Sequence, residues 1–410
     1  MRIAIIGGGA AGMMCAATLQ EQHPAADIFL IERNNGLGKK VIISGGGRCN
    51  VTTGIHDVRT LLTKYPRGNK FLTRAMYNFP PDAVYNWFED HGVPLKIQAD
   101  NRAFPASDDG HDIVAVFERL FANSNVRVFL KTTLLSVAKE NNEFVLTMKD
   151  QVEPLVVDRI VLTTGGQAYR QTGSTGDGYA FAIALGHTIT KLAPSLNAFF
   201  TQETWPTQLS GLSFPNATIS SHGEKKQRFT GPFLFTHKGV SGPAVFALSS
   251  LVAFETYNAQ QPLPITIDLF PEQSIDSVRV DLEHIMALNS QKQFVNTLGF
   301  FVPHSLAAVI VSELALDVTK RVNEISKKDV LRVCNWLKAI PLHVVQRGAG
   351  DEFVTAGGVP LSEIDPATLE STICPDLYFA GEIMDVDGFT GGFNLQASWA
   401  AGRLVGMKLC

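Results

Sequence analysis

The sequence predicts an α/β protein built on a Rossmann-like nucleotide-binding unit that is interrupted by β-rich and helical segments. An apolar strand at residues 2–6 runs into three glycines and a helix, and a second strand follows at 27–32. Two parallel strands joined by a crossover helix are the smallest piece of such a sheet. After residue 195 the pattern changes to short strands broken by turns, and after 274 it becomes helical.

The 410 residues exceed the usual size of one hydrophobic core, so the chain has several domains or one domain with large insertions. We expect residues 1–194 and 345–410 to form the nucleotide-binding domain. Residues 195–271 are expected as a β-rich insertion, with 341–356 as a candidate addition, and 272–340 as a helical insertion. Hydrophobic residues make up 45% and charged residues 18%, which is typical of folded proteins.

Charge and cysteine usage exclude several classes of protein. The formal net charge is −4 without a run of five like charges, so we expect no nucleic-acid partner. Five widely spaced cysteines without metal-ligand spacing predict no disulfide framework, no metal and a cytoplasmic location. The glycines in the apolar N-terminus favour a strand and helix over a signal peptide, and other apolar runs are shorter than the ~18 residues of a membrane span.

Several further elements are expected along the first half of the chain. Six glycines between residues 36 and 54 predict a long functional loop without regular structure. Residues 125–137 and 143–148 are expected as the two strands of a hairpin, and residues 158–166 as a central parallel strand that ends in two glycines.

The second half carries one clear helix start and a return to the first domain. Ser326 and Asp329 have capping-box spacing ahead of an apolar helical face that runs toward Ile340. Residues 376–382 are strand-like, and 395–409 form a helix rich in small residues.

The strongest motif is Gly7-x-Gly9-x-x-Gly12, which follows a strand and opens a helix. Its glycines permit a tight turn and close approach to a pyrophosphate, and the helix N-terminus supplies N–H groups for the anion. Glu32, twenty residues past Gly12, can accept from ribose hydroxyls and would repel a 2′-phosphate. The motif therefore predicts FAD or NAD rather than NADP.

A second glycine-rich segment, YFAGEIMDVDGFTGGFNLQ at 378–396, favours FAD over NAD. The flavin end of FAD, with its ribityl chain and ring, is longer than the nicotinamide end of NAD. It therefore needs contacts beyond the first βαβ unit. Gly381 and Glu382 could meet the ribityl hydroxyls, and the Gly391–Asn394 turn could let backbone approach the ring.

The motifs GGGAAG, KKVIISGGGRCN, GSTGDGYAFA, FTHKGVSGPA and AGEIMDVDGFTGGFNLQ together resemble the BaiN/YhiN-type family of FAD-dependent oxidoreductases, over essentially the whole chain. The TTGG and STGDG elements are also similar to those of fumarate-reductase-like flavoproteins. The resemblance implies an FAD domain made from both chain ends, with a β-barrel-like and a helical insertion. Members are associated with reducing enone bonds of bile-acid intermediates and with oxidising a small aminoketone, so the substrate does not transfer.

The resemblance also implies a set of cofactor contacts drawn from both ends of the chain. They are Gly7, Gly9, Ala10, Ala11, Gly12, Glu32, Arg33, Lys39, Gly45, Gly46, Gly47, Arg48, Cys49, Asn50, the backbone of Leu134, Gly165, Gly381, Glu382, Asn394, Leu395 and Gln396. The sequence departs from the family pattern at 101–105, 108–109, 169–170 and 197–198, and we interpret these positions as surroundings of a substrate pocket.

No catalytic residue can be assigned, but two are candidates. Cys49 beside Arg48 could have a lowered pKa and act as an acid or redox partner of the flavin; the alternative is a small residue packed against the cofactor. His237 could be a substrate acid–base group or anchor, and the alternative is a turn histidine. Asp177 is expected to cap the next helix or to lie near the cofactor, and His187 is expected to be structural.

The function expected from these features is hydride transfer between flavin N5 and a small organic substrate, as in an NAD(P)H-dependent enone reductase. The chain has no second strand-GxGxxG-helix unit, so NAD(P)H would bind transiently. The alternatives are an amine or aminoketone oxidase that uses oxygen, an FAD-bound redox sensor or scaffold, and a flavin-dependent RNA-modifying enzyme. Flavin reduction by NAD(P)H and an RNA gel shift would separate them.

Overall fold

The computed structural model describes residues 1–348 and 353–409. The chain divides into two compact units. The first comprises Met1–Ser195 and Glu352–Cys410, and the second comprises Leu196–Asp351.

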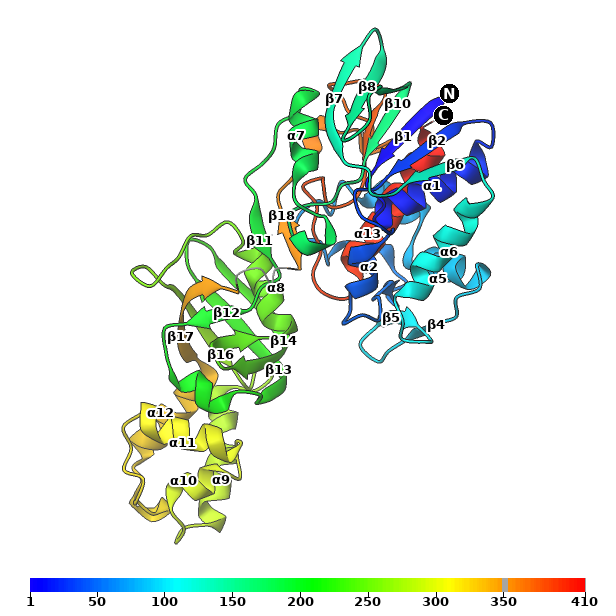
Figure 1. The fold of residues 1–410 in the computed structure, drawn as a ribbon. Coiled ribbons are helices and arrows are strands. Elements are labelled where there is room, and N and C mark those ends of the chain that lie inside the picture. Colours follow the sequence, from blue (N-terminus) through cyan, green and yellow to red (C-terminus); the bar gives the residue numbers. More distant parts are fainter. Residues whose placement is uncertain (349–352, 410) are drawn as a thin grey trace. The chain divides into compact units, whose positions relative to one another are not determined.

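The centre of the first unit is a parallel sheet in the order β19-β10-β1-β2-β6 (Figure 1). Its strands are β1 (Arg2–Ile6), β2 (Asp27–Ile31), β6 (Val126–Phe129), β10 (Arg159–Leu162) and β19 (Leu377–Phe379). Four of the five residues of β1 and of β2 are buried, as expected for strands covered on both faces. The predicted Rossmann-like α/β fold is confirmed.

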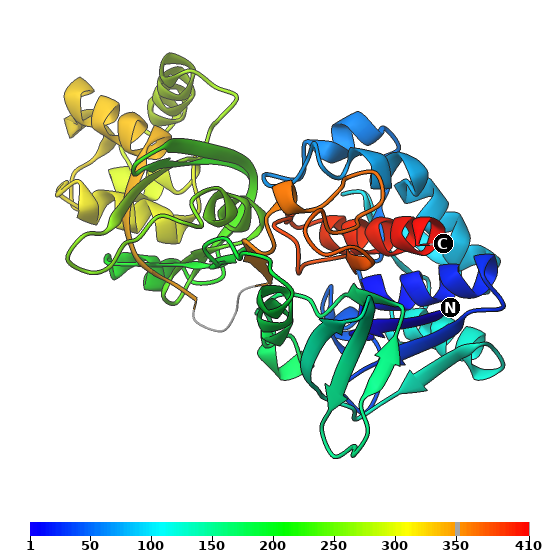
Figure 2. The same cartoon turned by 90° about the horizontal axis from the view of Figure 1, so that it is seen from above.

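Helices from the two ends of the chain pack against each other over this sheet. They are α1 (Ala10–Gln22) and α13 (Phe393–Lys408), which lie side by side in Figures 1 and 2. A Cβ atom on Gly402 would lie 2.3 Å from the carbonyl oxygen of Ala11, so a larger residue would push the helices apart. Trp399 on α13 is fully buried and stacks on Phe117 of α6 (His111–Ala122).

The glycine-rich segment is more regular than its composition predicted. Lys39–Ile43 form a short helix, α2, and Thr52–Thr53 form β3, so the expectation of no regular structure over 36–54 is wrong in these two places. The strand β3 belongs to a small antiparallel sheet with β5 (Arg102–Pro105) and β4 (Leu95–Ile97). The helices that follow β3 are α3 (Val58–Leu62), α4 (Thr73–Asn78) and α5 (Pro81–Asp90).

The stretch expected as one hairpin strand at 125–137 is two strands. After β6 the chain turns through Lys131, whose φ is 53°, and only then enters β7 (Leu134–Glu140). The turn is fixed to the end of β2, because the Thr132 N–H donates to the Glu32 carbonyl. The predicted hairpin partner is confirmed as β8 (Glu143–Met148), which also pairs with β9 (Leu155–Val157).

The first unit also contains several short elements outside this sheet. They are η1 (Arg170–Thr172), α7 (Asp177–Ala184), η4 (Leu361–Glu363), and the antiparallel pair of β11 (Ala193–Ser195) and β18 (Val354–Ala356).

The second unit contains a closed six-stranded barrel in the order β12-β15-β14-β13-β16-β17. The strands are β12 (Phe199–Thr201), β13 (Ser213–His222), β14 (Lys226–Thr236), β15 (Gly239–Ser241), β16 (Leu263–Asp268) and β17 (Ile340–Arg347), accompanied by η2 (Trp205–Leu209) and α8 (Pro243–Leu251). The predicted barrel-like sheet is confirmed.

The helices of the second unit are α9 (Ile275–Leu288), α10 (Phe294–Leu298), α11 (His304–Glu313), η3 (Val322–Glu324) and α12 (Lys327–Lys338). The Ser326 hydroxyl accepts from the Asp329 N–H, which confirms the predicted helix start. One hydrophobic cluster contains both barrel residues such as Ile267 and helix residues such as Leu337. None of the helices in the described part of the chain is long and apolar enough to cross a membrane.

Candidate cofactor site

The turn between β1 and α1 leaves open space on its outer side. Gly7 has φ 110°, a conformation that favours glycine. A Cβ atom on Gly12 would lie 1.9 Å from the Gly7 carbonyl oxygen, so this position excludes every side chain. A Cβ atom on Gly9 would meet nothing within 4 Å. Gly7 and Gly12 therefore shape the turn, whereas Gly9 borders the space where a pyrophosphate would bind.

The N-terminus of α1 is suited to an anion. Gly9 is the N-cap residue and offers no side-chain cap, and the first turn contains no acidic residue. Ala10 and Ala11 are buried and have small side chains. The N–H groups of this first turn have no partner within the helix, so they can bind phosphate oxygens with the help of the helix dipole.

Glu32 is held rigidly at the end of β2. Its Oε2 accepts from the Gly8 N–H at 2.8 Å, and its Oε1 accepts from the Asn34 N–H at 2.8 Å. Each carboxylate oxygen keeps a second lone pair that can accept from a ribose hydroxyl.

The neighbouring Arg33 is paired with Asp177. Its Nη1 lies 2.9 Å from Asp177 Oδ2 and also donates to the Thr175 hydroxyl at 2.7 Å. Gly176, without a side-chain cap, precedes α7, so the expectation that Asp177 is the N-cap is wrong. Asp177 starts the helix and binds Arg33 instead, which keeps the arginine beside the nucleotide-binding end of β2.

The loop that follows α2 exposes its backbone. Gly45, Gly46 and Gly47 have φ values of 59°, 74° and 87°, so three successive residues adopt the left-handed region. A Cβ atom on Gly46 or Gly47 would meet nothing within 4 Å. This open backbone fits the close approach of a flat ring.

Two side chains fix the end of this loop. The Arg48 guanidinium lies 4.0 Å from the centroid of the Phe104 ring and 3.6 Å from an oxygen of Asp108. The Asn50 amide, in the orientation that its neighbours require, accepts from the Gly392 N–H at 2.8 Å and donates to the Thr52 carbonyl at 3.1 Å. Asn50 therefore joins the glycine loop to the turn before α13.

Cys49 is buried as a packed residue would be, and it does not have the lowered pKa of a reactive thiol. Its side chain is fully buried, and this burial raises the pKa of the thiol from 9.0 to about 12. The expectation of a lowered pKa beside Arg48 is wrong, because loss of hydration outweighs any effect of the neighbouring cation. At neutral pH Cys49 is an uncharged thiol packed under the loop.

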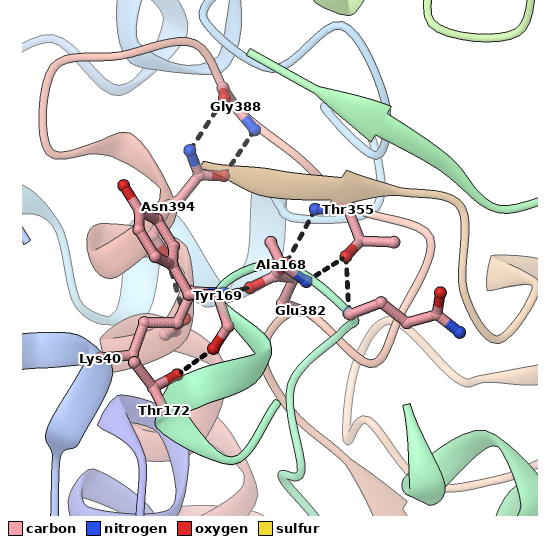
Figure 3. A network of polar contacts seen from close by, with 10 residues as sticks. Lys40, Ala168, Tyr169, Thr172, Thr355, Glu382, Gly388 and Asn394 are labelled. Carbon is pink, nitrogen blue, oxygen red and sulfur yellow. Dashed lines mark hydrogen bonds and ion pairs between the residues drawn. The ribbon is translucent and has the colours of Figure 1, made fainter. Parts of the chain in front are cut away.

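Glu382 connects three distant segments of the first unit (Figure 3). Its Oε2 accepts from Lys40 Nζ at 2.6 Å, and its Oε1 accepts from the Thr355 N–H at 2.8 Å. The Thr355 hydroxyl in turn accepts from the Gln167 and Ala168 N–H groups at 2.7 and 3.1 Å. Lys40, next to the expected Lys39, thus ties α2 to the C-terminal segment, and sequence spacing gave no sign of this pair.

Gly381 brings the C-terminal segment against the dinucleotide turn. Its φ is 82°, and a Cβ atom there would lie 3.1 Å from that of Ala11. Gly165, with φ 75°, follows β10, and the buried Leu134 begins β7. These positions lie at the ends of strands of the first unit.

The polar side chains before and within α13 bind other parts of the protein. Asn394 and the Gly388 backbone exchange two hydrogen bonds of 2.8 Å, which close the turn shown in Figure 3. Gln396 is buried, accepts from the Thr52 hydroxyl at 2.6 Å and donates to the Phe79 carbonyl at 2.9 Å. Leu395 is half-buried between them. For Asn394 and Gln396, cofactor contact remains a prediction, and the Gln396 N–H already donates to the Gly392 carbonyl at 2.9 Å.

A buried ion pair near the same turn escaped sequence reasoning. Arg67 donates from Nε and Nη2 to the two carboxylate oxygens of Asp387, which is 1% exposed. The Ser195 hydroxyl also donates to Asp387, at 2.9 Å. Burial raises the pKa of the neighbouring Asp385. The partners are 320 positions apart, so no local pattern could reveal the pair.

His237 lies in the second unit, in the turn between β14 and β15, and is exposed. Its carbonyl accepts from the Thr207 hydroxyl at 3.3 Å. His187 is buried and contacts Glu363 Oε2 at 2.9 Å and the Ser371 hydroxyl at 2.8 Å, as expected of a structural histidine. Across residues 1–348 and 353–409, no group of three or more His, Cys, Asp or Glu side chains could hold a metal ion.

Comparison with known proteins places the chain in a defined group. A family model described as HI0933-like protein Rossmann domain matches residues 1–408. A 3-dehydro-bile acid delta(4,6)-reductase of Clostridium scindens is 27% identical over 410 residues, covering 99% of this chain and 98% of that protein. A ribosomal RNA dihydrouridine synthase of Escherichia coli is 27% identical over 402 residues, covering 97% and 95%. A protein of the same name from Haemophilus influenzae is 26% identical over 405 residues, with the same two coverages.

Two solved structures show the same fold at low sequence identity. A 3-ketosteroid delta1-dehydrogenase of Sterolibacterium denitrificans has a TM-score of 0.53 and 12% identity, covering 99% of this chain and 98% of that one. The quinol fumarate reductase subunit FrdA of E. coli has a TM-score of 0.51 and 13% identity, covering 100% and 70%.

Proposed function

The chain belongs to the HI0933-like Rossmann-domain family and is an FAD-dependent oxidoreductase, and we propose that it reduces a carbon–carbon double bond conjugated with a carbonyl group. When bound, FAD supplies a two-electron carrier that accepts a hydride from one reactant and gives it to another. The backbone is open beside Gly9 and beside Gly46–Gly47, which fits this cofactor. Glu32, between them in sequence, is held by the Gly8 N–H.

The observation that carries the proposal is the chemistry shared by the names of the relatives. A delta(4,6)-reductase acting on a 3-dehydro bile acid saturates double bonds conjugated with a 3-oxo group. A dihydrouridine synthase saturates the ring double bond of uridine, which is conjugated with a ring carbonyl. The two substrates differ greatly in size and charge, but the reacting group is the same.

The proposed reaction requires a hydride, a proton and an electron donor. The hydride adds to the carbon β to the carbonyl, and a proton adds to the α carbon. We propose NADH or NADPH as the donor, which becomes NAD⁺ or NADP⁺ as it gives up the hydride. A transient donor is consistent with the single dinucleotide motif of the sequence, at Gly7–Gly12.

We propose that residues of the first unit orient the cofactor. The first turn of α1 is suited to the pyrophosphate, and Glu32 to the adenosine ribose. Asn50 and Gly392 hold the glycine loop against the C-terminal turn. Cys49 stays a neutral thiol under this loop, so we propose that it packs and does not transfer protons.

The leading candidate substrate is a small enone. The test is an anaerobic stopped-flow measurement of flavin absorbance, first with NADH or NADPH and then with a cyclic enone, using the saturated ketone as control. We expect NADH or NADPH to bleach the flavin absorbance. The enone should restore this absorbance, and the saturated ketone should not. If neither nicotinamide reduces the flavin, the NAD(P)H-dependent reductase is ruled out. If an amine reduces the flavin and oxygen restores it, an oxidase is the better description.

The second candidate substrate is a uracil ring in RNA, favoured by two relatives that carry the name ribosomal RNA dihydrouridine synthase. Incubation of deproteinised ribosomal RNA with the protein and NADPH, followed by mass spectrometry of nucleosides, measures dihydrouridine directly. A gain over the sample without NADPH would support this substrate, and its absence would leave the enone as the candidate.

A further inference from the structure

A local surplus of positive charge is hidden by the negative net charge of the chain. Residues 58–79 contain five Lys or Arg residues and no Asp or Glu, whereas the whole chain has 35 basic and 39 acidic residues. The five are Arg59, Lys64, Arg67, Lys70 and Arg74. Clustered cations on an otherwise acidic protein indicate an anionic partner at that surface.

Three exposed residues lie close together along this segment. A turn, closed by the Leu72 N–H donating to the Gly68 carbonyl, leads into α4, which begins at Thr73. Arg74 and Tyr77 are at positions i and i+3 of α4, on one side of the helix, and Lys70 lies in the preceding turn, four positions before Arg74. All three are exposed, and Tyr77 is 55% exposed. We call these three residues the α4 basic face.

The cations of the α4 basic face are not neutralised by the protein. In the described part of the chain, neither Lys70 nor Arg74 forms an ion pair with a carboxylate. By contrast, Arg67 in the same segment is bound to Asp387. The opposite side of the helix is apolar, since Leu72, Ala75 and Met76 are buried, so the fold is stabilised without the exposed residues.

The segment is fixed to the C-terminal wall of the candidate cofactor site. The Lys64 carbonyl accepts from the Phe389 N–H at 2.9 Å, and the Tyr65 hydroxyl donates to the Phe393 carbonyl at 2.7 Å. A Cβ atom on Gly68 would lie 2.6 Å from the Val386 side chain. The segment that leads into the α4 basic face is therefore packed against the turn at 386–394.

We propose that the α4 basic face binds an RNA strand that presents its base to the cofactor site. This inference rests on the second candidate substrate above. Lys70 and Arg74 would contact phosphates, and Tyr77 offers a ring on which a base can stack. Lys70 and Tyr77 are seven positions apart in the chain, so the face is longer than one phosphate group requires. With Tyr77 as its single large apolar side chain, the face suits RNA better than a membrane surface.

The test measures binding of deproteinised ribosomal RNA by filter retention at two salt concentrations, about 0.1 and 0.2 M. The variants are K70E/R74E, Y77A and a charge-matched control, K327E/K328E, in the exposed first turn of α12. K70E/R74E should weaken binding at least about tenfold and lower the salt slope by about 1.5. Y77A should weaken binding about tenfold with an unchanged slope. The control should bind like the wild type.

Folding and the proposed function are checked in the same samples. Flavin content, melting temperature and enone-dependent NAD(P)H oxidation should be unchanged in K70E/R74E. If this charge reversal impairs folding, the neutral variant K70Q/R74Q is used in its place. Equal RNA binding by K70E/R74E and the control would overturn the inference, as would wild-type protein that binds anionic phospholipid vesicles but not RNA. If the protein does not reduce the enone but its RNA binding depends on the α4 basic face, the small enone is ruled out as substrate and the RNA inference stands.

Discussion

Lys40 donates a 2.6 Å hydrogen bond to Glu382, which lies 342 positions further along the chain. The pair joins α2 to the strand end after β19, and the side chains are 25% and 17% exposed. Because Glu382 also accepts from the Thr355 N–H, one carboxylate holds three walls of the candidate cofactor site together. We expect Glu382 to matter mainly because it positions these segments, since a partly solvated ion pair contributes little energy.

Glu382→Ala is therefore expected to weaken FAD binding about tenfold, because the Lys40 and Thr355 contacts are both lost and the Thr355 N–H loses its partner. Glu382→Gln keeps an acceptor for Thr355 and should have a smaller effect. The measurement is the flavin retained after gel filtration, with Glu143→Gln at the exposed first residue of β8 as control. Equal retention by Glu382→Ala and the control would contradict the connecting role.

Gly9 and Gly12 should respond differently to the same substitution. Gly9 has φ −83°, and a Cβ atom there would meet nothing within 4 Å, so Gly9→Ala should leave the melting temperature of the flavin-free protein unchanged but weaken FAD binding. Gly12→Ala places a methyl group 1.9 Å from the Gly7 carbonyl and should impair folding itself. Differential scanning calorimetry without and with FAD separates the two effects. Similar melting temperatures for both flavin-free variants would count against the turn geometry.

Cys49 is expected to be unreactive in the folded protein. Burial raises its thiol pKa to about 12, so little thiolate forms at about pH 8, and the group is inaccessible. Iodoacetamide should label Cys49 only after unfolding, and Cys49→Ser should keep the wild-type pH profile of turnover. Since the folded pKa lies above the ordinary value of 9.0, any stability from the neutral thiol is lost as pH rises from 9.0 toward 12. Rapid labelling of native protein at Cys49 would refute the assignment.

The sequence predicted the parts of the fold that local patterns encode. Gly7, Gly9 and Gly12 between a strand and a helix predicted the turn, and Ser326 predicted the start of α12. Local patterns failed where a distant partner decides the conformation. Residues 125–137 have continuous strand propensity, but Lys131 turns because its N–H donates to the Asn34 carbonyl, and this breaks the strand.

The candidate site was predictable as a set of backbone positions but less so as side-chain chemistry. Glycines that permit close approach can be read from sequence, as at Gly46 and Gly47. Of the two interpretations of Cys49, the lowered pKa was wrong, because a neighbouring Arg is visible in sequence whereas complete burial is not; a packed residue agrees with the structure. The Arg67–Asp387 pair could not be anticipated because its partners come from opposite ends of the chain.

His187 should make the folded state sensitive to mild acid. Its ring is buried against Phe379 at 4.8 Å, and burial lowers its pKa more than the nearby Glu363 raises it. The unfolded chain therefore binds a proton near pH 6.5 that the folded state resists, so stability is lost as pH falls from 6.5 through the lower folded pKa. Urea midpoints at about pH 7.5 and pH 5 measure this loss. His187→Gln should be less stable than wild type at the higher pH and should lose less on acidification, while exposed His284→Gln should match wild type at both. An equal drop in the His187→Gln variant would show that other groups, such as carboxylates with lowered pKa values, control acid stability.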